Sequence, residues 1–396
     1  LIESLNFKEG MQILEQLLDK NINNKRALSG YLFNQNYNPQ INYDKINSYI
    51  KKFNDKSKQD NLNIINFCYK KKPEKINVGF ISPDFRSHPV GYAITNVIEH
   101  LKSYNFKLFG YYSFSLVDEL TNKFKKDFDY FQNVTDLNDE QIINKIRSDG
   151  IHILIDLAGY TSHNRLSIFF NNPAPIQISM LGYLVTTGIK EIKYKIGDPY
   201  IYPETAEKNF SEKILRLPSI WSDFAVKQNA DLSKLSFDEN NDEIIFGCFV
   251  TLRKINENVI KLWSKVLKKF SNTKIYFKSP ELNNVLIEKD LKKKFLNYGI
   301  KSDQLVMEKS SDYKTYLESY SKVHISLDPF PWNGVTTSFE SIWMGVPVFC
   351  LKGNNLPYSR CAYSINKNLK MDDWIAIDEN DYLLKLERIL SNKKEL

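Results

Sequence analysis

The sequence has 396 residues and a formal net charge of +7, from 54 basic and 47 acidic side chains. It is 42% hydrophobic and 13% aromatic, which provides enough apolar surface for packed cores and excludes an intrinsically disordered chain. No apolar run approaches the roughly 20 residues of a membrane-spanning helix, and the first ten residues lack the basic and then apolar pattern of a signal peptide. We therefore expect a cytoplasmic protein of two domains, with no membrane among its partners.

The basic residues and the cysteines show no pattern of a nucleic-acid or metal site. Lysine runs at 70–72 and 292–294 are typical of solvated helix ends and linkers, and no RNA- or DNA-binding motif accompanies them. The cysteines lack the CxxC spacing of zinc sites and are expected to be buried free thiols: Cys68, Cys248, Cys350 and Cys361. We expect no nucleic acid among the partners, although a basic balance suits an anionic substrate.

Residues 1–72 are predicted to form a helical segment. Apolar residues recur at the spacing of one helix face in 10–20 and again in 43–53, and Pro73 ends this section. From residue 73 to about 225 the pattern changes to apolar strands that alternate with amphipathic helices. The strands are expected at 76–82, 106–114, 151–159 and 174–180, and the helices at 90–101 and 138–150, the latter capped by Asn138. Such alternation predicts a parallel sheet with helices on both faces.

The alternation stops between about 219 and 242, where the sequence is polar and has no clear period. We interpret this stretch as a linker to a second domain at 240–396. There the strands are expected at 244–250, 273–279 and 324–328, with a helix at 256–270 capped by Asn256. The predicted fold class is therefore α/β, with two facing Rossmann-like domains and a cleft at the carboxyl ends of their strands, where open α/β sheets bind ligands.

The segment from Asp328 to Val348 has the order expected of a phosphate site. A buried strand is followed by a turn with two prolines and Gly334, and then by Thr336 and Thr337 at the start of a helix. A helix start has N–H groups without partners and a partial positive charge, and the threonines could cap the helix and offer hydroxyls. Glu340, one turn further on, lies near where a ribose would reach. The alternative is an ordinary capped helix whose first-turn acid complements the dipole.

Three other loops at predicted strand ends hold polar residues. His88 follows the first strand, and the alternative to a substrate contact is a histidine satisfied by backbone groups. Lys254 follows the strand at 244–250 and could neutralise charge on a leaving diphosphate, with an ordinary surface lysine as the alternative. Thr186 and Thr187 form a second Thr-Thr-Gly turn, whose backbone and hydroxyls could face the same cleft.

Two further patterns are not assigned to the site. Asp127 and Asp129 match the DxD pattern that holds a metal in some glycosyltransferases, but they lie at the end of an amphipathic helix. His152 lies within an apolar strand and is predicted to be a satisfied core histidine. We therefore expect no metal site.

Five ordered segments together resemble the catalytic region of the O-GlcNAc transferase and SPINDLY family of glycosyltransferases, closer to bacterial SPINDLY-like members. They are VGFISPDFRSHPVGY, DGIHILIDLAGYTSHNRL, NPAPIQISMLGY followed by TTG, FGCFVTLRKINENVIKLW and ISLDPFPWNGVTTSFESIWMGVPV. The resemblance covers roughly residue 26 to the end. It implies a GT-B fold after a short TPR-like helical segment, a nucleotide-sugar donor held mainly by the second domain, no metal or other cofactor, and inverting transfer to Ser/Thr hydroxyls of a protein acceptor.

The resemblance also implies roles for individual residues. Lys254 matches the family lysine that contacts the donor diphosphate, and Thr336 and Thr337 match the phosphate-binding pair. Glu340 takes the place of the acidic residue at the ribose, and His88 matches the loop histidine near donor and acceptor. His88 and Lys254 are thus the expected catalytic residues.

The sequence departs from the family pattern at four positions. Leu184 and Val185 replace a Pro-Gly pair, Val250 replaces a polar amide, and Val335 stands where the human-like branch has a histidine. UDP-GlcNAc, UDP-glucose and GDP-fucose therefore all stay open as donors. The alternative function is a catalytically inactive member that binds a nucleotide sugar or a protein. Because the chain lacks an initiator methionine and most of the helical repeats of the family, we expect it to be a fragment of a longer protein.

Overall fold

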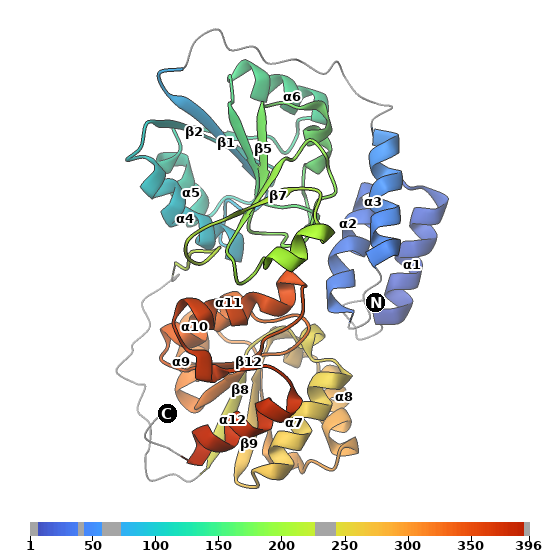
Figure 1. Ribbon diagram of the computed structural model, residues 1–396, viewed down its shortest axis with the longest axis vertical. Coiled ribbons are helices and arrows are strands. Elements are labelled where there is room, and N and C mark those ends of the chain that lie inside the picture. Colours follow the sequence, from blue (N-terminus) through green and yellow to red (C-terminus); the bar gives the residue numbers. More distant parts are fainter. Residues whose placement is uncertain (1–6, 39–42, 58–72, 226–242, 392–396) are drawn as a thin grey trace. The chain divides into compact units, whose positions relative to one another are not determined.

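The computed structural model describes residues 7–38, 43–57, 73–225 and 243–391. They fall into two compact units, one within residues 8–225 and the other containing residues 243–391. Each unit is built around its own sheet, flanked by helices (Figure 1). Most of the predicted linker, from 226 to 242, lies outside the described residues.

Where the structure describes it, the predicted segment 1–72 is helical and belongs to the first unit, whereas residues 1–6, 39–42 and 58–72 lie outside the described residues. It comprises α1 (Phe7–Lys20), α2 (Lys25–Asn34) and α3 (Tyr43–Ser57). On α3, Asn54 Nδ2 donates a hydrogen bond of 2.5 Å to the carbonyl of Gly188, and the ring of Phe53 lies 5.9 Å from that of Phe170. These contacts join the helices to the sheet-containing part, so the two form one unit and the 72/73 boundary does not separate compact bodies.

The described residues of the first unit form a parallel sheet of seven strands in the order β3-β2-β1-β4-β5-β6-β7. The order reverses between β1 and β4, which makes their carboxyl ends the expected ligand position. The strands are β1 (Ile76–Ser82), β2 (Phe106–Tyr112), β3 (Tyr130–Asn133), β4 (Ile153–Asp156), β5 (Ile176–Ser179), β6 (Tyr194–Gly197) and β7 (Lys213–Arg216). The helices after the first three strands are α4 (Pro89–Leu101), α5 (Glu119–Asp127) and α6 (Asp139–Ser148).

The second unit repeats this topology with six described strands, in the order β10-β9-β8-β11-β12-β13, all parallel. The reversal here lies between β8 and β11. The strands are β8 (Ile244–Cys248), β9 (Thr273–Lys278), β10 (Leu305–Glu308), β11 (Ile325–Leu327), β12 (Val348–Leu351) and β13 (Ile375–Ala376). The helices are α7 (Glu257–Lys269), α8 (Val285–Asn297), α9 (Tyr313–Glu318), α10 (Thr336–Trp343), α11 (Cys361–Asn368) and α12 (Glu379–Ser391).

Both predicted helix caps are confirmed. The Asn138 side chain accepts a hydrogen bond from the backbone of Gln141, whose own side chain bonds back to the N–H of Asn138, so the two form a capping box. Asn256 accepts from the N–H groups of Asn258 and Val259. Each cap fixes where the helix starts, and the cap at Asn256 comes two residues after Lys254.

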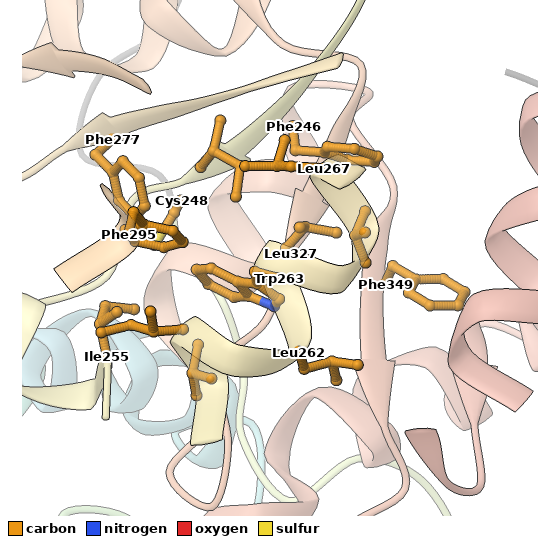
Figure 2. Packing of buried hydrophobic residues seen from close by; sticks show 14 of the residues in the cluster. Phe246, Cys248, Ile255, Leu262, Trp263, Leu267, Phe277, Phe295, Leu327 and Phe349 are labelled. Carbon is orange, nitrogen blue, oxygen red and sulfur yellow. The ribbon is translucent and has the colours of Figure 1, made fainter. Parts of the chain in front are cut away.

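Alternate side chains of the second sheet enter two separate cores. Trp263 of α7 is fully buried and lies among Phe277, Phe295 and Leu327 on one face of the sheet (Figure 2). Tyr276, next to Phe277 on β9, packs into the other core beneath α9 with Leu317 and neighbouring residues. Because helices cover both faces, consecutive residues of β9 such as Tyr276 and Phe277 are both apolar and buried, as expected of a parallel sheet. Of the four cysteines, Cys248, Cys350 and Cys361 are buried free thiols, and Cys68 lies outside the described residues.

Among the described residues, no helix combines the length and the apolar character that crossing a membrane would require.

Candidate functional site

The turn between β11 and α10 is folded around the carboxylate of Asp328, which lies directly after β11 and is buried. Its Oδ1 accepts hydrogen bonds from the N–H of Gly334 at 2.7 Å and from Ser338 Oγ at 3.4 Å. A Cβ atom on Gly334 would lie 2.5 Å from Ser338 Oγ, 2.7 Å from Thr337 Oγ1 and 3.0 Å from Asp328 Oδ1. The turn therefore favours glycine at this position, because a side chain would displace the serine, the threonine or the carboxylate.

Thr336 and Thr337 are the first two residues of α10 and are half-buried. The expectation that they cap the helix is wrong: Val335 occupies the cap position, and no side chain caps the helix there. Within the described part of the chain, the hydroxyls and the N–H groups of both threonines have no hydrogen-bond partner. A helix start with two N–H groups and two hydroxyls without partners matches the predicted phosphate seat.

Lys254 lies on a short 3-10 helix, Leu252–Lys254, after β8. Its Nζ donates a hydrogen bond of 2.6 Å to the carbonyl of Asn333 and lies 5.4 Å from the ring centroid of Trp332. The structure therefore brings this lysine to the same turn that leads into Thr336. The alternative of an ordinary surface lysine does not fit this position.

Burial acts on both charged groups at the turn. It lowers the pKa of Lys254 from its usual value, and the nearby negative charge of Asp328 opposes this effect. Burial likewise raises the pKa of Asp328, although the Gly334 N–H and the lysine favour its ionised form. Asp328 Oδ2 accepts no hydrogen bond from the described residues. A bound anion beside Lys254 would favour the charged ammonium, because opposite charges stabilise each other at close range.

A pocket opens at the carboxyl ends of β8 and β11, where the strand order reverses. Its polar lining comes from Ser326, Asp328, Thr337 and Ser338. The complete lining is Gly247, Phe249, Val250, Ser326, Leu327, Asp328, Thr337, Ser338 and Val348. This is the position at which open α/β sheets bind ligands, and Val250, one of the departures from the family pattern, forms part of the wall.

Glu340 is buried on α10, one turn after Thr336 and Thr337. Tyr313 OH donates to its Oε1 and Tyr316 OH to its Oε2, each at 2.9 Å. These tyrosines were not among the residues predicted from the sequence. Their signal was the recurrence of tyrosine at 313, 316 and 320, which is the spacing of one helix face directly before β11.

In the first unit, His88 caps α4 and lies beside a buried acid. Its Nδ1 is 3.3 Å from the N–H of Val90, from which it accepts, and 3.4 Å from Asp84 Oδ1. The backbone contact proposed as the alternative is thus present. Its side chain is 34% exposed. Burial raises the pKa of Asp84 to about 6 against the opposing charge of Arg86. Sequence reasoning did not single out Asp84.

The structure corrects the assignment of Thr186 and Thr187. Both are buried, and their hydroxyls donate to the two oxygens of Glu212, at 2.6 Å to Oε2 and 2.5 Å to Oε1. The N–H of Thr187 also donates to Glu212 Oε1, at 2.7 Å. The prediction that these hydroxyls face a ligand site is wrong, because a carboxylate from 25 residues further along the chain already occupies them.

The residues set aside in the sequence analysis have structural contacts. Asp127 accepts from Lys123 at 2.7 Å and lies 3.3 Å from Lys102 Nζ, and Asp129 accepts from the N–H of Leu108 at 2.7 Å. His152 Nδ1 accepts from the N–H of Asn77 at 2.9 Å, as expected of a satisfied core histidine. The described residues contain no group of three His, Cys, Asp or Glu side chains able to hold a metal ion.

The fold and the site define a class of protein. Two Rossmann-like sheets in succession are the architecture of GT-B glycosyltransferases. A mutant of the O-GlcNAc transferase from Thermobaculum terrenum has this fold, with a TM-score of 0.90 and 24% identity, covering 97% of this chain and 73% of that one. The predicted α/β fold of GT-B type is thus confirmed.

The sequence model of glycosyl transferase family 41 matches residues 57–232 and 225–396, and the chain belongs to this family. Among its relatives is the "Probable UDP-N-acetylglucosamine--peptide N-acetylglucosaminyltransferase SPINDLY" of Solanum lycopersicum, 26% identical over 332 residues, which are 82% of this chain and 36% of that protein. The SPINDLY protein of Arabidopsis thaliana is 27% identical over 319 residues, which are 79% of this chain and 35% of that protein. The chain thus spans about a third of the length of these relatives, and the predicted resemblance is confirmed.

Proposed function

We propose that the chain is the catalytic region of a protein O-glycosyltransferase. It would transfer a sugar from a nucleotide-sugar donor to Ser or Thr hydroxyls of proteins, with inversion at the sugar carbon. The observation that carries the proposal is the position of Lys254, which reaches the turn before Thr336 and Thr337. A cation, helix N–H groups and hydroxyls meet there at the carboxyl edge of the sheet, and these are the groups that bind a diphosphate.

The same groups suit the chemical step. When the bond from the sugar to phosphate breaks, negative charge builds on the leaving nucleoside diphosphate. In our proposal the Lys254 ammonium and the start of α10 stabilise this charge, which lowers the barrier more than it tightens ground-state binding. Glu340, one turn further along α10, is proposed to accept hydrogen bonds from the ribose. His88, of the first unit, is proposed to act close to donor and acceptor.

We further propose that no metal and no other cofactor takes part. In metal-dependent enzymes a divalent cation neutralises the leaving diphosphate. Here the lysine, the helix dipole and the threonine hydroxyls would supply that stabilisation, and the DxD carboxylates of Asp127 and Asp129 are engaged by lysines and backbone.

The donor sugar is proposed to be GlcNAc, fucose or glucose. The printed names of the relatives, which refer to UDP-N-acetylglucosamine and to peptide acceptors, support UDP-GlcNAc. The segment FESIWMGVPV, which contains Glu340, is closer to the SPINDLY-like branch of the family and keeps GDP-fucose in consideration. The departures at Leu184, Val185 and Val250 keep UDP-glucose open as well.

The test is a donor panel. The chain is incubated with radiolabelled UDP-GlcNAc, UDP-glucose or GDP-fucose and with lysate proteins, with Lys254→Ala as the matched control. We expect one donor to label protein in a form released by alkaline β-elimination, and the control to abolish labelling. Nucleotide binding with neither transfer nor release of sugar from any donor would contradict the proposal and support an inactive binding protein.

A further inference from the structure

Two tyrosines of α9 hold the carboxylate of Glu340 from both sides. Tyr313 OH donates to Oε1 and Tyr316 OH donates to Oε2, at 2.9 Å each. Glu340 is only 4% exposed, so the phenols replace much of the hydration that a carboxylate has in water. Because each oxygen has its own donor, the plane of the carboxylate is fixed relative to α10.

The same tyrosines connect Glu340 to the turn that we assign to the diphosphate. Tyr316 OH lies 3.1 Å from Tyr320 OH, and Tyr320 OH donates to the carbonyl of Thr337 at 3.1 Å. The ring of Tyr320 stacks on Phe249, with centroids 3.8 Å apart, and Phe249 lines the pocket together with Thr337. A change at these phenols therefore reaches both Glu340 and the start of α10.

An ionised carboxylate offers about four lone-pair sites, so one phenol donor on each oxygen does not by itself saturate it. Burial raises the pKa of the Tyr316 hydroxyl far above its usual value, with the negative charge of Glu340 adding to the effect, so this hydroxyl keeps its proton and donates. Thr337 and Glu340 are three residues apart, so they are neighbours on one face of α10, with about 5–6 Å between their Cβ atoms. That separation suits the step from a phosphate to the ribose attached to it.

We propose that Tyr313 and Tyr316 are positioning residues, which hold the Glu340 carboxylate in the orientation that accepts hydrogen bonds from the donor ribose. This inference rests on the proposed function, in which Glu340 meets the ribose. A glutamate side chain that is already immobilised loses less conformational entropy when it binds, so the tyrosines increase affinity without touching the ligand themselves.

The experiment compares nucleotides with and without ribose hydroxyls. Dissociation constants of UDP and GDP are measured by calorimetry for the unaltered chain. The tighter of the two and its 2′,3′-dideoxy form are then measured with a Tyr313→Phe, Tyr316→Phe double variant and with Glu340→Gln. Phenylalanine keeps the ring packing and removes only the hydroxyl. Tyr298→Phe is the matched control, because Tyr298 OH donates to Glu257 Oε1 at 2.6 Å at an exposed position of the same unit.

We expect the double tyrosine variant to bind the ribose nucleotide about tenfold more weakly, because the two hydrogen bonds that orient the charged carboxylate of Glu340 are lost. Affinity for the dideoxy nucleotide should fall less than about twofold, since it lacks the hydroxyls that Glu340 would bind. Glu340→Gln should show the same pattern, and adding the tyrosine substitutions to it should cause little further loss. Tyr298→Phe should leave both affinities unchanged.

Equal losses for the ribose and dideoxy nucleotides would overturn the proposal, because the tyrosines would then only support the fold. The proposal would also be overturned if Glu340→Gln lowered affinity for the ribose nucleotide alone while the tyrosine variants lowered neither affinity. If the unaltered chain binds neither UDP nor GDP, the proposed function itself fails, and that result is distinct from both others. Thermal unfolding checks that each variant is folded, and the two single tyrosine variants give the same comparison if the double variant is unstable.

Discussion

The two Thr-Thr pairs of this chain show how different surroundings lead one dipeptide to two roles. In the first unit, Thr186 and Thr187 are buried, and both hydroxyls donate to Glu212. In the second unit, Thr336 and Thr337 begin α10, and no described residue accepts from them. The first pair has a partner built into the fold and is structural. The second has none, and it is the pair to which we assign a ligand.

The two units also differ in the surroundings of a lysine close to an aspartate, Lys195 near Asp156 in the first unit and Lys254 near Asp328 in the second. Lys195 is fully buried, and its Nζ donates to the carbonyl of Tyr183 at 2.7 Å and to Ser179 Oγ at 3.2 Å, near Asp156. Burial lowers the pKa of Lys195 to about 8, with Glu212 and Asp156 opposing. Lys254 is also buried enough for its pKa to fall, but it reaches a turn beside a pocket. Lys195, inside β6, is thus a structural lysine, whereas Lys254, on the loop after β8, is a candidate catalytic one.

The largest expected effect is on stability, from Glu212→Ala in the first unit. Removing this carboxylate leaves the two threonine hydroxyls and a backbone N–H buried without an acceptor, and takes a negative charge away from Lys195. We expect the free energy of unfolding to fall by about 3–5 kcal/mol. Urea unfolding measures the loss. Glu207→Ala is the control, because Glu207 pairs with Arg216 while half exposed and should contribute less than about 1 kcal/mol.

The second prediction concerns Lys254 and catalysis. Lys254→Ala should lower kcat by about 100-fold or more, which corresponds to roughly 3 kcal/mol of activation free energy. The reason is that the negative charge that Lys254 stabilises is largest as the sugar–phosphate bond breaks. Lys254→Arg should restore little, since a planar fork does not replace a point charge in a fitted site. Steady-state kinetics with the active donor measure the effect, and Lys265→Ala, at an exposed ion pair with Glu379, is the control.

Normal turnover by a folded Lys254→Ala variant would show that our placement of the donor diphosphate is wrong.

The third prediction exchanges hydroxyl for methyl in both threonine pairs. Thr336→Val with Thr337→Val should weaken binding of the nucleoside diphosphate about tenfold and leave the unfolding midpoint nearly unchanged. Thr186→Val with Thr187→Val should do the opposite, because it removes two of the hydrogen bonds to buried Glu212 and should cost about 2–3 kcal/mol of stability. Calorimetry and thermal unfolding on both double variants test the contrast. Equal effects on affinity from the two pairs would contradict the division of roles.

The smallest expected effect is that of chelation. Activity with the preferred donor should be unchanged, within about twofold, in EDTA, because the lysine, the helix N–H groups and the hydroxyls stabilise the negative charge that develops on the diphosphate. Transfer assays with and without EDTA, followed by added magnesium or manganese, measure this. Loss on chelation with recovery on metal addition would require a metal site and a new account of Asp127 and Asp129.

Much of the fold could be predicted because its signals are local. Strand β1 has the predicted bounds, and the caps at Asn138 and Asn256 start their helices where the sequence indicated. The site could be predicted in part for the same reason, since Lys254 and Thr336 each follow a strand of one sheet. The Glu212 contacts and the Tyr313–Glu340 bond could not, because they join residues far apart in the sequence whose spacing carries no local period.

The sequence by itself determined the alternation of strands and helices, the helix starts and the family, because periodicity, capping and ordered motifs act over a few residues. Only the tertiary structure decided which polar groups are already satisfied. A hydroxyl is available to a ligand when no acceptor reaches it, and the acceptor for Thr187 comes from 25 residues away, whereas none of the described residues reaches Thr337 Oγ1. Since a buried hydroxyl must find a partner, the fold gives one Thr-Thr pair a structural role and leaves the other available to the ligand that we propose.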